Sequence, residues 1–118
     1  MFNFEKLEVW KKSIELADTI YSRTRAFPAE ERFGLTTQLR RAAVSVSSNI
    51  AEGSSRSSKV DFARFIEIGT GSIFELVSQI FIAQRQGFLS EENFQELYTD
   101  AQQIGRMLSG LRKSISPK

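Results

Sequence analysis

The sequence predicts an all-α protein that folds as an antiparallel up-down-up-down four-helix bundle. Four segments of the 118-residue chain place apolar residues three and four positions apart, which is the spacing of one helix face. The links between these segments are short, and no segment shows the strict apolar–polar alternation of a strand. A chain of this length can bury one hydrophobic core, so we expect residues 1–118 to form a single domain.

The first predicted helix covers about residues 7–24 and ends before Pro28, because the residue preceding a proline is disfavoured in the α region. Six residues are expected on its inward stripe: Leu7, Trp10, Ile14, Ala17, Tyr21 and Thr24. Three more apolar residues cluster nearly opposite that stripe, namely Val9, Leu16 and Ile20. Large exposed apolar patches usually mark interfaces, so we expect these three residues to contact another copy of the chain.

The second predicted helix covers about residues 31–54. Its inner stripe holds six residues: Leu35, Leu39, Ala42, Val46, Ile50 and Gly53. The outer face carries mostly small side chains around Arg40, and no acid lies between Arg32 and Glu52. This outer face is therefore locally basic, and its small side chains permit a close approach by a partner.

Two adjacent arginines, Arg40 and Arg41, stand out in this helix. The guanidinium group offers planar donors to phosphate or carboxylate, so we expect the outward-directed Arg40 to contact a nucleic acid or a neighbouring subunit. Arg41 points to a flank, where an ion pair with Glu75 or Glu52 is the slightly favoured alternative to a ligand contact. Asn49, on a flank of the inner stripe, is expected to fix the helix register rather than to act on a ligand.

The third predicted helix covers about residues 57–86, with Gly87 as its C-terminal glycine. Four residues define its inward side: Phe65, Leu76, Ile80 and Ala83. Five others extend the apolar arc to about half of the helix surface: Ile66, Ile73, Phe74, Val77 and Phe81. We expect Phe74, Val77 and Phe81 to lie in an oligomer interface. The alternative is that this helix is simply the most buried of the four.

The turn between the second and third helices is rich in serine and basic residues. Arg56, Lys59 and Arg64 lie at this turn and in the first turns that follow, where a helix N-terminus also attracts anions. The acidic residues Glu52 and Asp61 partly offset this positive charge. A phosphate-binding cluster and an ordinary solvated turn are equally compatible with the sequence.

The fourth predicted helix begins after Ser90 as N-cap, with Leu89 and Phe94 spaced for a hydrophobic staple. Its stripe is the most regular in the chain: Phe94, Leu97, Ala101, Ile104, Leu108, Leu111 and Ile115. This regular stripe supports the assignment of a four-helix bundle.

Composition narrows the classes of function. The chain contains no cysteine and no histidine, so we expect no disulfide, no metal site and no cofactor, and we expect a protein that is not an enzyme. The opening residues carry charges from Glu5 onward and lack the apolar run of a signal peptide, and no segment is an uninterrupted apolar span. We therefore expect a cytoplasmic protein without a membrane partner.

Several phrases of the sequence point to a known family. The stretch FPAEERFGLTTQLRRAAVSVSSNIAEG, followed by DFARFIEIGTGSIFEL and the link QGFLSEE, resembles the 23S rRNA intervening-sequence proteins, and the opening FEKLEVWKKSIELADTIY fits as well. The resemblance implies a four-helix bundle that assembles into a homopentamer and binds nucleic acid, as in the related accessory proteins of diversity-generating retroelements. The family's signature positions in this chain are Arg40, Arg41, the segment from Asn49 to Gly53, and Glu75.

These observations leave two hypotheses for function. The first is a non-catalytic oligomeric bundle that binds RNA or DNA through phosphate contacts. Its candidate residues are Arg40, Arg41, Arg56, Lys59 and Arg64. Because the sequence shows no exposed aromatic cluster and no recognition-helix motif, we expect no base stacking and little sequence specificity. The second hypothesis is a scaffold that binds a protein partner, such as a neighbouring nucleic-acid enzyme, without binding nucleic acid itself.

Overall fold

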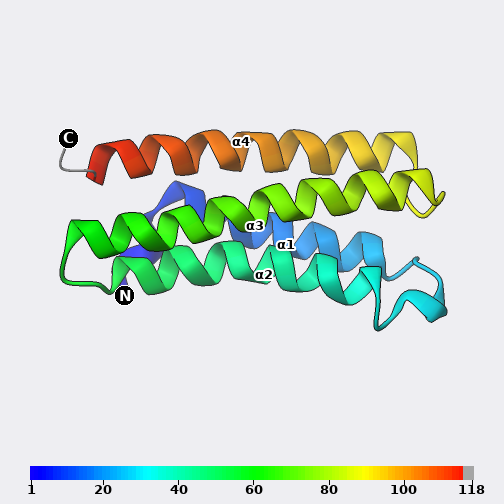
Figure 1. Cartoon of the computed structure of the whole chain (residues 1–118), viewed down its shortest axis with the longest axis horizontal. Helices are drawn as coiled ribbons and strands as arrows, with labels where there is room; N and C mark the ends of the chain where they lie inside the picture. Colours follow the sequence, from blue (N-terminus) through cyan, green and yellow to red (C-terminus); the bar gives the residue numbers. More distant parts are fainter. Residues whose placement is uncertain (116–118) are drawn as a thin grey trace.

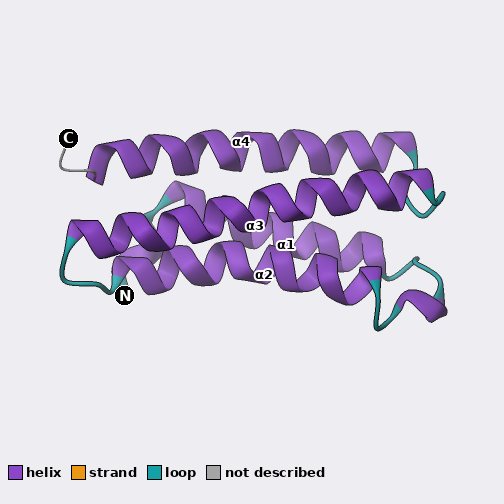
Figure 2. Cartoon of the chain, viewed as in Figure 1, coloured by secondary structure: helices purple, strands orange, loops and turns teal. Residues whose placement is uncertain are grey.

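Four long helices run antiparallel to one another in a computed structural model that describes residues 1–115 (Figure 1). They are α1 (Glu8–Thr24), α2 (Leu35–Ser54), α3 (Lys59–Arg85) and α4 (Glu91–Ile115). Two short 3-10 helices, η1 (Asn3–Lys6) and η2 (Ala29–Glu31), precede α1 and α2. The described residues contain no strand, as Figure 2 shows, so the predicted all-α bundle is confirmed.

Each helix packs against two neighbours. Helices α1 and α3 both contact α2 and α4, so the four helices surround one core. The bundle as a whole extends over 44 × 22 × 21 Å. The N-terminal segment, the α2–α3 turn and the end of α4 lie at the same end of the bundle, on the left in Figure 1. We call this the terminal end. The α1–α2 and α3–α4 connections lie at the opposite end.

The helix boundaries follow the predicted signals except at the start of α2. The side chain of Ser58 accepts a hydrogen bond from the Asp61 amide at 3.1 Å, and Gly87 has a φ of 80° after the end of α3. Helix α2 begins four residues later than predicted. Glu31 lies in η2, where its Oε1 accepts a hydrogen bond from the Leu35 amide at 3.1 Å. Glu31 therefore caps α2 from outside the helix instead of belonging to it.

The core confirms the predicted inner stripes of α2 and α4. All six predicted α2 residues are buried, and so are the first five of the seven predicted α4 residues, while Leu111 and Ile115 are partly buried. At the terminal end the α2 backbone approaches α3 closely at Gly53. A Cβ on this glycine would lie 2.7 Å from the Cβ of Phe65, which is closer than real side chains pack.

The predicted inward face of α1 is wrong in part. Thr24 is buried as predicted, and Leu7, Trp10 and Ala17 are partly buried against the core, but Ile14 and Tyr21 are exposed. Leu16 is 1% exposed and Val9 and Ile20 are also buried, whereas Ile14 is 37% exposed. Val9, Leu16 and Ile20 therefore belong to the core of the single chain and are not available to another subunit.

The true inner face of α1 includes two polar residues, of which the predicted stripe contained Thr24 but not Ser13. The hydroxyl groups of Ser13 and Thr24 donate to the carbonyl oxygens of Val9 and Ile20, each at 2.7 Å, so both residues are satisfied when buried. Ser13 is fully buried, yet it contributes nothing to an apolar count. A pattern of hydrophobic residues alone therefore favours the wrong side of the helix.

Some of the α3 residues that extend the apolar arc beyond its predicted inward side also belong to the core. Ile66 and Ile73 are buried, whereas Phe74 and Phe81 are exposed and Val77 is partly buried. By length and composition α3 could cross a membrane, a test that core helices of globular proteins also pass. Here Leu76 and Ile80, at the centre of its inner side, are fully buried within the bundle.

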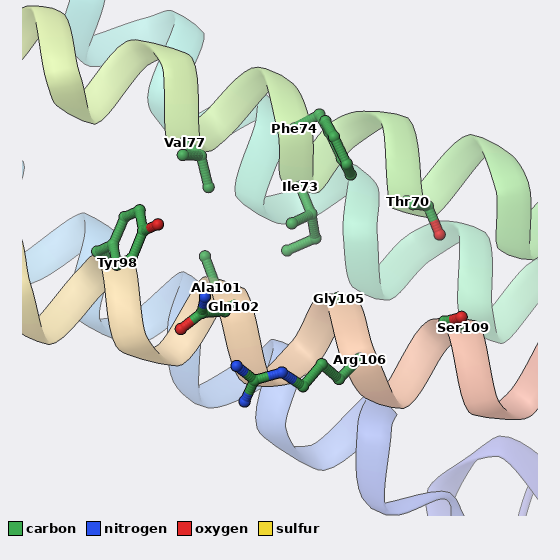
Figure 3. Close-up of a pocket in the computed structure, with 10 residues that line it drawn as sticks. All are labelled: Thr70, Ile73, Phe74, Val77, Tyr98, Ala101, Gln102, Gly105, Arg106 and Ser109. Atoms are coloured by element: carbon green, nitrogen blue, oxygen red, sulfur yellow. The ribbon is translucent and has the colours of Figure 1, made fainter.

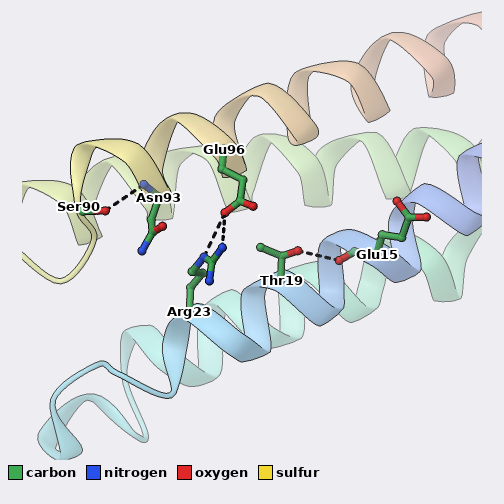
Figure 4. A network of polar contacts seen from close by, with 6 residues as sticks. All are labelled: Glu15, Thr19, Arg23, Ser90, Asn93 and Glu96. Carbon is green, nitrogen blue, oxygen red and sulfur yellow. Dashed lines mark hydrogen bonds and ion pairs between the residues drawn. The ribbon is translucent and has the colours of Figure 1, made fainter.

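Polar contacts connect neighbouring helices. Arg23 of α1 donates from Nη2 to the Glu96 carboxylate of α4 at 2.7 Å, as Figure 4 shows beside the Ser90 cap. Between α2 and α3, the hydroxyls of Ser45 and Ser72 lie 2.8 Å apart. Asn49 donates to the Ser45 carbonyl at 2.8 Å and so holds this serine in place.

Candidate nucleic-acid interface

The five predicted basic residues form two groups rather than one cluster. Arg40 and Arg41 lie in the first half of α2, and Arg56, Lys59 and Arg64 lie at and after the α2–α3 turn. The rise of an α-helix is 1.5 Å per residue, so the two groups are about 20 Å apart along α2. A single phosphate cannot contact both groups, but a nucleic-acid strand is long enough to do so.

The first group borders an open hollow of about 520 Å³ on the α1–α2 side of the bundle. We call it the arginine groove. It is lined by Tyr21, Thr37, Arg40, Arg41, Val44 and Ser45.

Arg40 does not project freely outward as predicted. Its Nε donates to the Thr24 hydroxyl at 2.9 Å, and its guanidinium lies 4.6 Å from the centre of the Tyr21 ring. The side chain therefore packs along α1 and is half-buried. Arg40 forms the wall of the groove, and only part of its guanidinium is available to a ligand.

Arg41 is the exposed member of the pair. It has no hydrogen bond or ion pair within residues 1–115, so the predicted contacts with Glu75 and Glu52 are both absent there. The Glu52 carboxylate pairs with Arg56 at 2.9 Å. The Glu75 carboxylate is directed along its own helix, where it accepts from Gln79 Nε2 at 3.4 Å. Arg41 is thus free to bind an anion.

The second group contains one engaged and two exposed cations. Besides its ion pair with Glu52, Arg56 lies over the Phe65 ring, with 4.6 Å between the guanidinium carbon and the ring centre. Lys59 and Arg64 are exposed and have no polar side-chain partner among the described residues. Of the five predicted residues, these two and Arg41 are the best placed to contact phosphate.

The terminal end gathers further positive charge from α4. Residues 101–115 contain Arg106, Arg112 and Lys113 and no acid. Arg112 forms an ion pair with Glu67 of α3, whereas Arg106 and Lys113 are exposed. The cations of the α2–α3 turn therefore lie at the same end of the bundle as the basic end of α4.

An aromatic cluster at the same end was missed in the sequence. The rings of Phe2 and Phe4 are stacked with centres 5.8 Å apart, and Phe4 meets Trp10 edge-on at 4.9 Å. Asn3 donates from Nδ2 to the Ser54 carbonyl at 3.2 Å, which fixes the cluster beside the α2–α3 turn. The cluster forms because η1 turns the chain back on itself, and no periodic signal in the sequence predicts that turn.

A second surface feature is an apolar groove of about 500 Å³ between α3 and α4 (Figure 3). We call it the α3–α4 groove. Its lining residues are Thr70, Ile73, Phe74, Val77, Tyr98, Ala101, Gln102, Gly105, Arg106 and Ser109. Phe74, at its edge, is 71% exposed. Two of the predicted interface residues of α3, Phe74 and Val77, therefore border a single apolar depression.

The titratable side chains form no metal-binding arrangement within residues 1–115, where no three carboxylates come together as a possible ion site. One carboxyl group has a shifted pKa. Burial raises the pKa of Asp100, nearby Glu96 and Glu15 raise it further, and Lys12 opposes them. Asp100 lines only a small hollow of about 40 Å³ between α1 and α4. The carboxylates of residues 1–115 therefore suggest no metal site, and the candidate binding features of this part of the chain are the cations and the apolar surfaces described above.

Comparisons with known proteins agree with this architecture. A family model described as 23S rRNA-intervening sequence protein matches residues 5–110. The crystal structure of a protein of unknown function from the S23 ribosomal protein family of Bacteroides thetaiotaomicron superposes with a TM-score of 0.83. It is 24% identical in sequence, and the match covers 89% of this chain and 95% of that one. A search of curated proteins gives no match. The structural similarity establishes the shared fold.

Proposed function

The chain belongs to the 23S rRNA-intervening sequence protein family, and on this premise we propose that it is a non-catalytic, oligomeric, cytoplasmic protein that binds RNA or DNA through its basic surface. The observation that carries this proposal is the set of exposed cations without acidic partners in the described chain. Of the five residues predicted to bind nucleic acid, Arg41, Lys59 and Arg64 belong to this set. We call them the free cations.

Such a surface favours contacts with phosphate over contacts with base edges. Arginine and lysine bind phosphate oxygens by charge-assisted hydrogen bonds, which carry no sequence information. Each neutralised phosphate releases a condensed counterion, so the affinity should fall steeply as the salt concentration rises. We therefore expect binding with little sequence preference and a strong dependence on salt.

Reversing the free cations tests this proposal. In the triple variant Arg41→Glu, Lys59→Glu, Arg64→Glu, we expect at least a tenfold loss of affinity for a labelled oligonucleotide. The slope of log affinity against log salt should also become shallower by about 2 to 3, since each lost phosphate contact contributes roughly 0.7 to 0.9. Fluorescence anisotropy across a salt series measures both quantities.

A matched control separates position from net charge. The triple variant Arg25→Glu, Arg32→Glu, Arg85→Glu changes the net charge by the same amount, but its three exposed residues lie at the α1–α2 and α3–α4 connections, far from Lys59 and Arg64. It should retain most of the affinity and nearly the whole salt slope. Equal losses in both triple variants, or an affinity that salt does not change, would rule out the proposed surface.

The oligomer is proposed to form through the exposed face of α3. Phe74 and Phe81 are exposed and Val77 is partly buried. Together with the α3–α4 groove they offer an apolar surface of the kind that usually marks an interface. The family resemblance supports five copies.

Placing a charge on this surface should dissociate the assembly. We expect native mass spectrometry to find five copies of the 13.4 kDa chain for the unmodified protein and a monomer for Phe74→Glu. Ile68→Glu is the control, because Ile68 is also half-exposed on α3 but lies about 120° around the helix from Phe74. A monomeric unmodified protein would contradict the oligomer.

The α3–α4 groove also favours a second candidate function, a scaffold that binds an apolar helix of a protein partner. The same spectra distinguish the two functions. Extra mass that nuclease removes supports the nucleic-acid binder, whereas extra mass that nuclease leaves in place and that denaturing mass spectrometry identifies as a second polypeptide supports the scaffold.

A further inference from the structure

We infer that the aromatic cluster of Phe2, Phe4 and Trp10 is a stacking platform for the bases of single-stranded nucleic acid. This inference rests on the proposed function and specifies its substrate class. The platform lies at the terminal end, beside the cations of the α2–α3 turn.

The outermost ring of the platform, that of Phe2, is exposed on one side and packs against the Phe4 ring on the other. Phe2 is 71% exposed, and its ring is nearly parallel to that of Phe4, with 17° between the two planes. Phe4 in turn contacts Trp10, which packs against the hydrophobic core. A flat base can extend this stack, because nucleobases and aromatic side chains present compatible π faces.

Hydrogen bonds hold the platform in place before any ligand binds. The Phe2 amide donates to Glu5 Oε2 at 2.9 Å, which closes the η1 turn. The Ser54 hydroxyl donates to Asn3 Oδ1 at 3.2 Å, and Asn3 donates back to the Ser54 carbonyl. A ring that is already ordered loses less conformational entropy when a base stacks on it.

Cations lie close in the sequence to the residue that anchors the platform. Ser54, which anchors η1, is two residues from Arg56, and Lys59 begins α3 immediately after the turn. Basic groups beside aromatic rings are the combination by which proteins bind single strands without sequence preference. In a duplex the base faces are already stacked on one another, so only unpaired bases can use the platform.

Phe33 provides a natural comparison at the opposite end of the bundle. It is 86% exposed and has Arg32 nearby, with 5.6 Å between the guanidinium carbon and the ring centre. No second ring stacks with Phe33 among the described residues. Phe33 is therefore exposed and close to a cation but is not part of a platform.

Anisotropy titrations with four probes test the inference. The probes are a thymidine 12-mer, a uridine 12-mer, an abasic 12-mer of equal charge, and a 12-base-pair duplex. We expect the unmodified protein to bind the two base-containing single strands at least tenfold more tightly than the abasic strand. The thymidine and uridine arms distinguish DNA from RNA, and a stacking preference for either one supports the platform.

Variants then locate the preference. Phe2→Ala should weaken binding of the base-containing strands about 5- to 140-fold while leaving the abasic affinity and the salt slope unchanged. Phe2→Trp should restore the binding, and Phe33→Ala should have no effect. The fluorescence of Trp10, the only tryptophan, should change on binding in the unmodified protein.

The outcomes separate this inference from the proposed function. Equal affinity for the abasic and thymidine strands, which carry the same charge, would overturn the platform and leave phosphate binding intact. The absence of binding to all four probes would overturn both. If Phe2→Ala instead dissociates the oligomer in native mass spectrometry, the cluster is a subunit contact and the inference is wrong.

Discussion

Replacing Leu16 with alanine is expected to lower the free energy of unfolding by about 2–5 kcal/mol, the usual cost of truncating a buried leucine. Leu16 is 1% exposed, so the change removes apolar contacts and leaves a cavity that the surrounding helices can fill only in part. Urea denaturation followed by circular dichroism measures the effect.

Ile14→Ala is the matched control on the same helix. Ile14 is 37% exposed, so its truncation removes little buried surface and should cost roughly 1 kcal/mol or less. The two variants decide which side of α1 faces the core. A larger loss of unfolding free energy for Ile14→Ala than for Leu16→Ala would indicate that α1 has the orientation that the apolar pattern predicts. If Leu16 were a subunit contact, its effect would also depend on the protein concentration.

Replacing Gly53 with alanine is expected to destabilise the protein by about 1–3 kcal/mol, the range for overpacking a tight contact. The new Cβ would lie 2.7 Å from the Phe65 Cβ and 3.0 Å from Phe62 Cδ1. A Cβ atom cannot rotate away as the end of a long side chain can, so α2 and α3 must move apart at the terminal end.

A loss of stability in Gly53→Ala would be informative, because helix propensity alone predicts a gain. Alanine is a better helix former than glycine by about 1 kcal/mol. Gly71→Ala isolates this gain, since a Cβ at Gly71 meets nothing within 4 Å. Gly71→Ala should be neutral or stabilising when the thermal or urea denaturation of both variants is compared with that of the unmodified protein. A Gly53→Ala variant as stable as Gly71→Ala would show that the helices have room to separate at little cost.

The helices themselves were predictable because their signals are local. Ser58 and Gly87 mark the ends of α3 by hydrogen bonding and backbone conformation within a few residues. The inner stripes of α2 and α4 are almost purely apolar, so their periodicity identifies the buried face without ambiguity. The inner face of α1 includes Ser13, whose burial depends on a hydrogen bond to its own helix, and an apolar pattern does not register it.

The candidate site was less predictable because its geometry depends on contacts between distant segments. The position of Arg40 is set by Thr24 of α1, sixteen residues earlier, and the exposure of Arg41 by the direction of the Glu75 side chain. The aromatic cluster depends on the bond between Asn3 and Ser54, 51 residues apart. Residue types predict only a chemical class of ligand, whereas the grouping of the residues required the tertiary structure.

The placement of the aromatic cluster and the α2–α3 turn at one end of the bundle has a consequence for avidity. In any cyclic assembly, equivalent atoms lie at equal height and radius around the rotation axis. In such an assembly, every copy would place Phe2, Arg56 and Lys59 at the same end of the ring. A strand held at one copy would meet the next at a high effective concentration, so that individually weak contacts would add up to tight binding. The length of single strand at which affinity stops rising would then report how many copies a strand can reach.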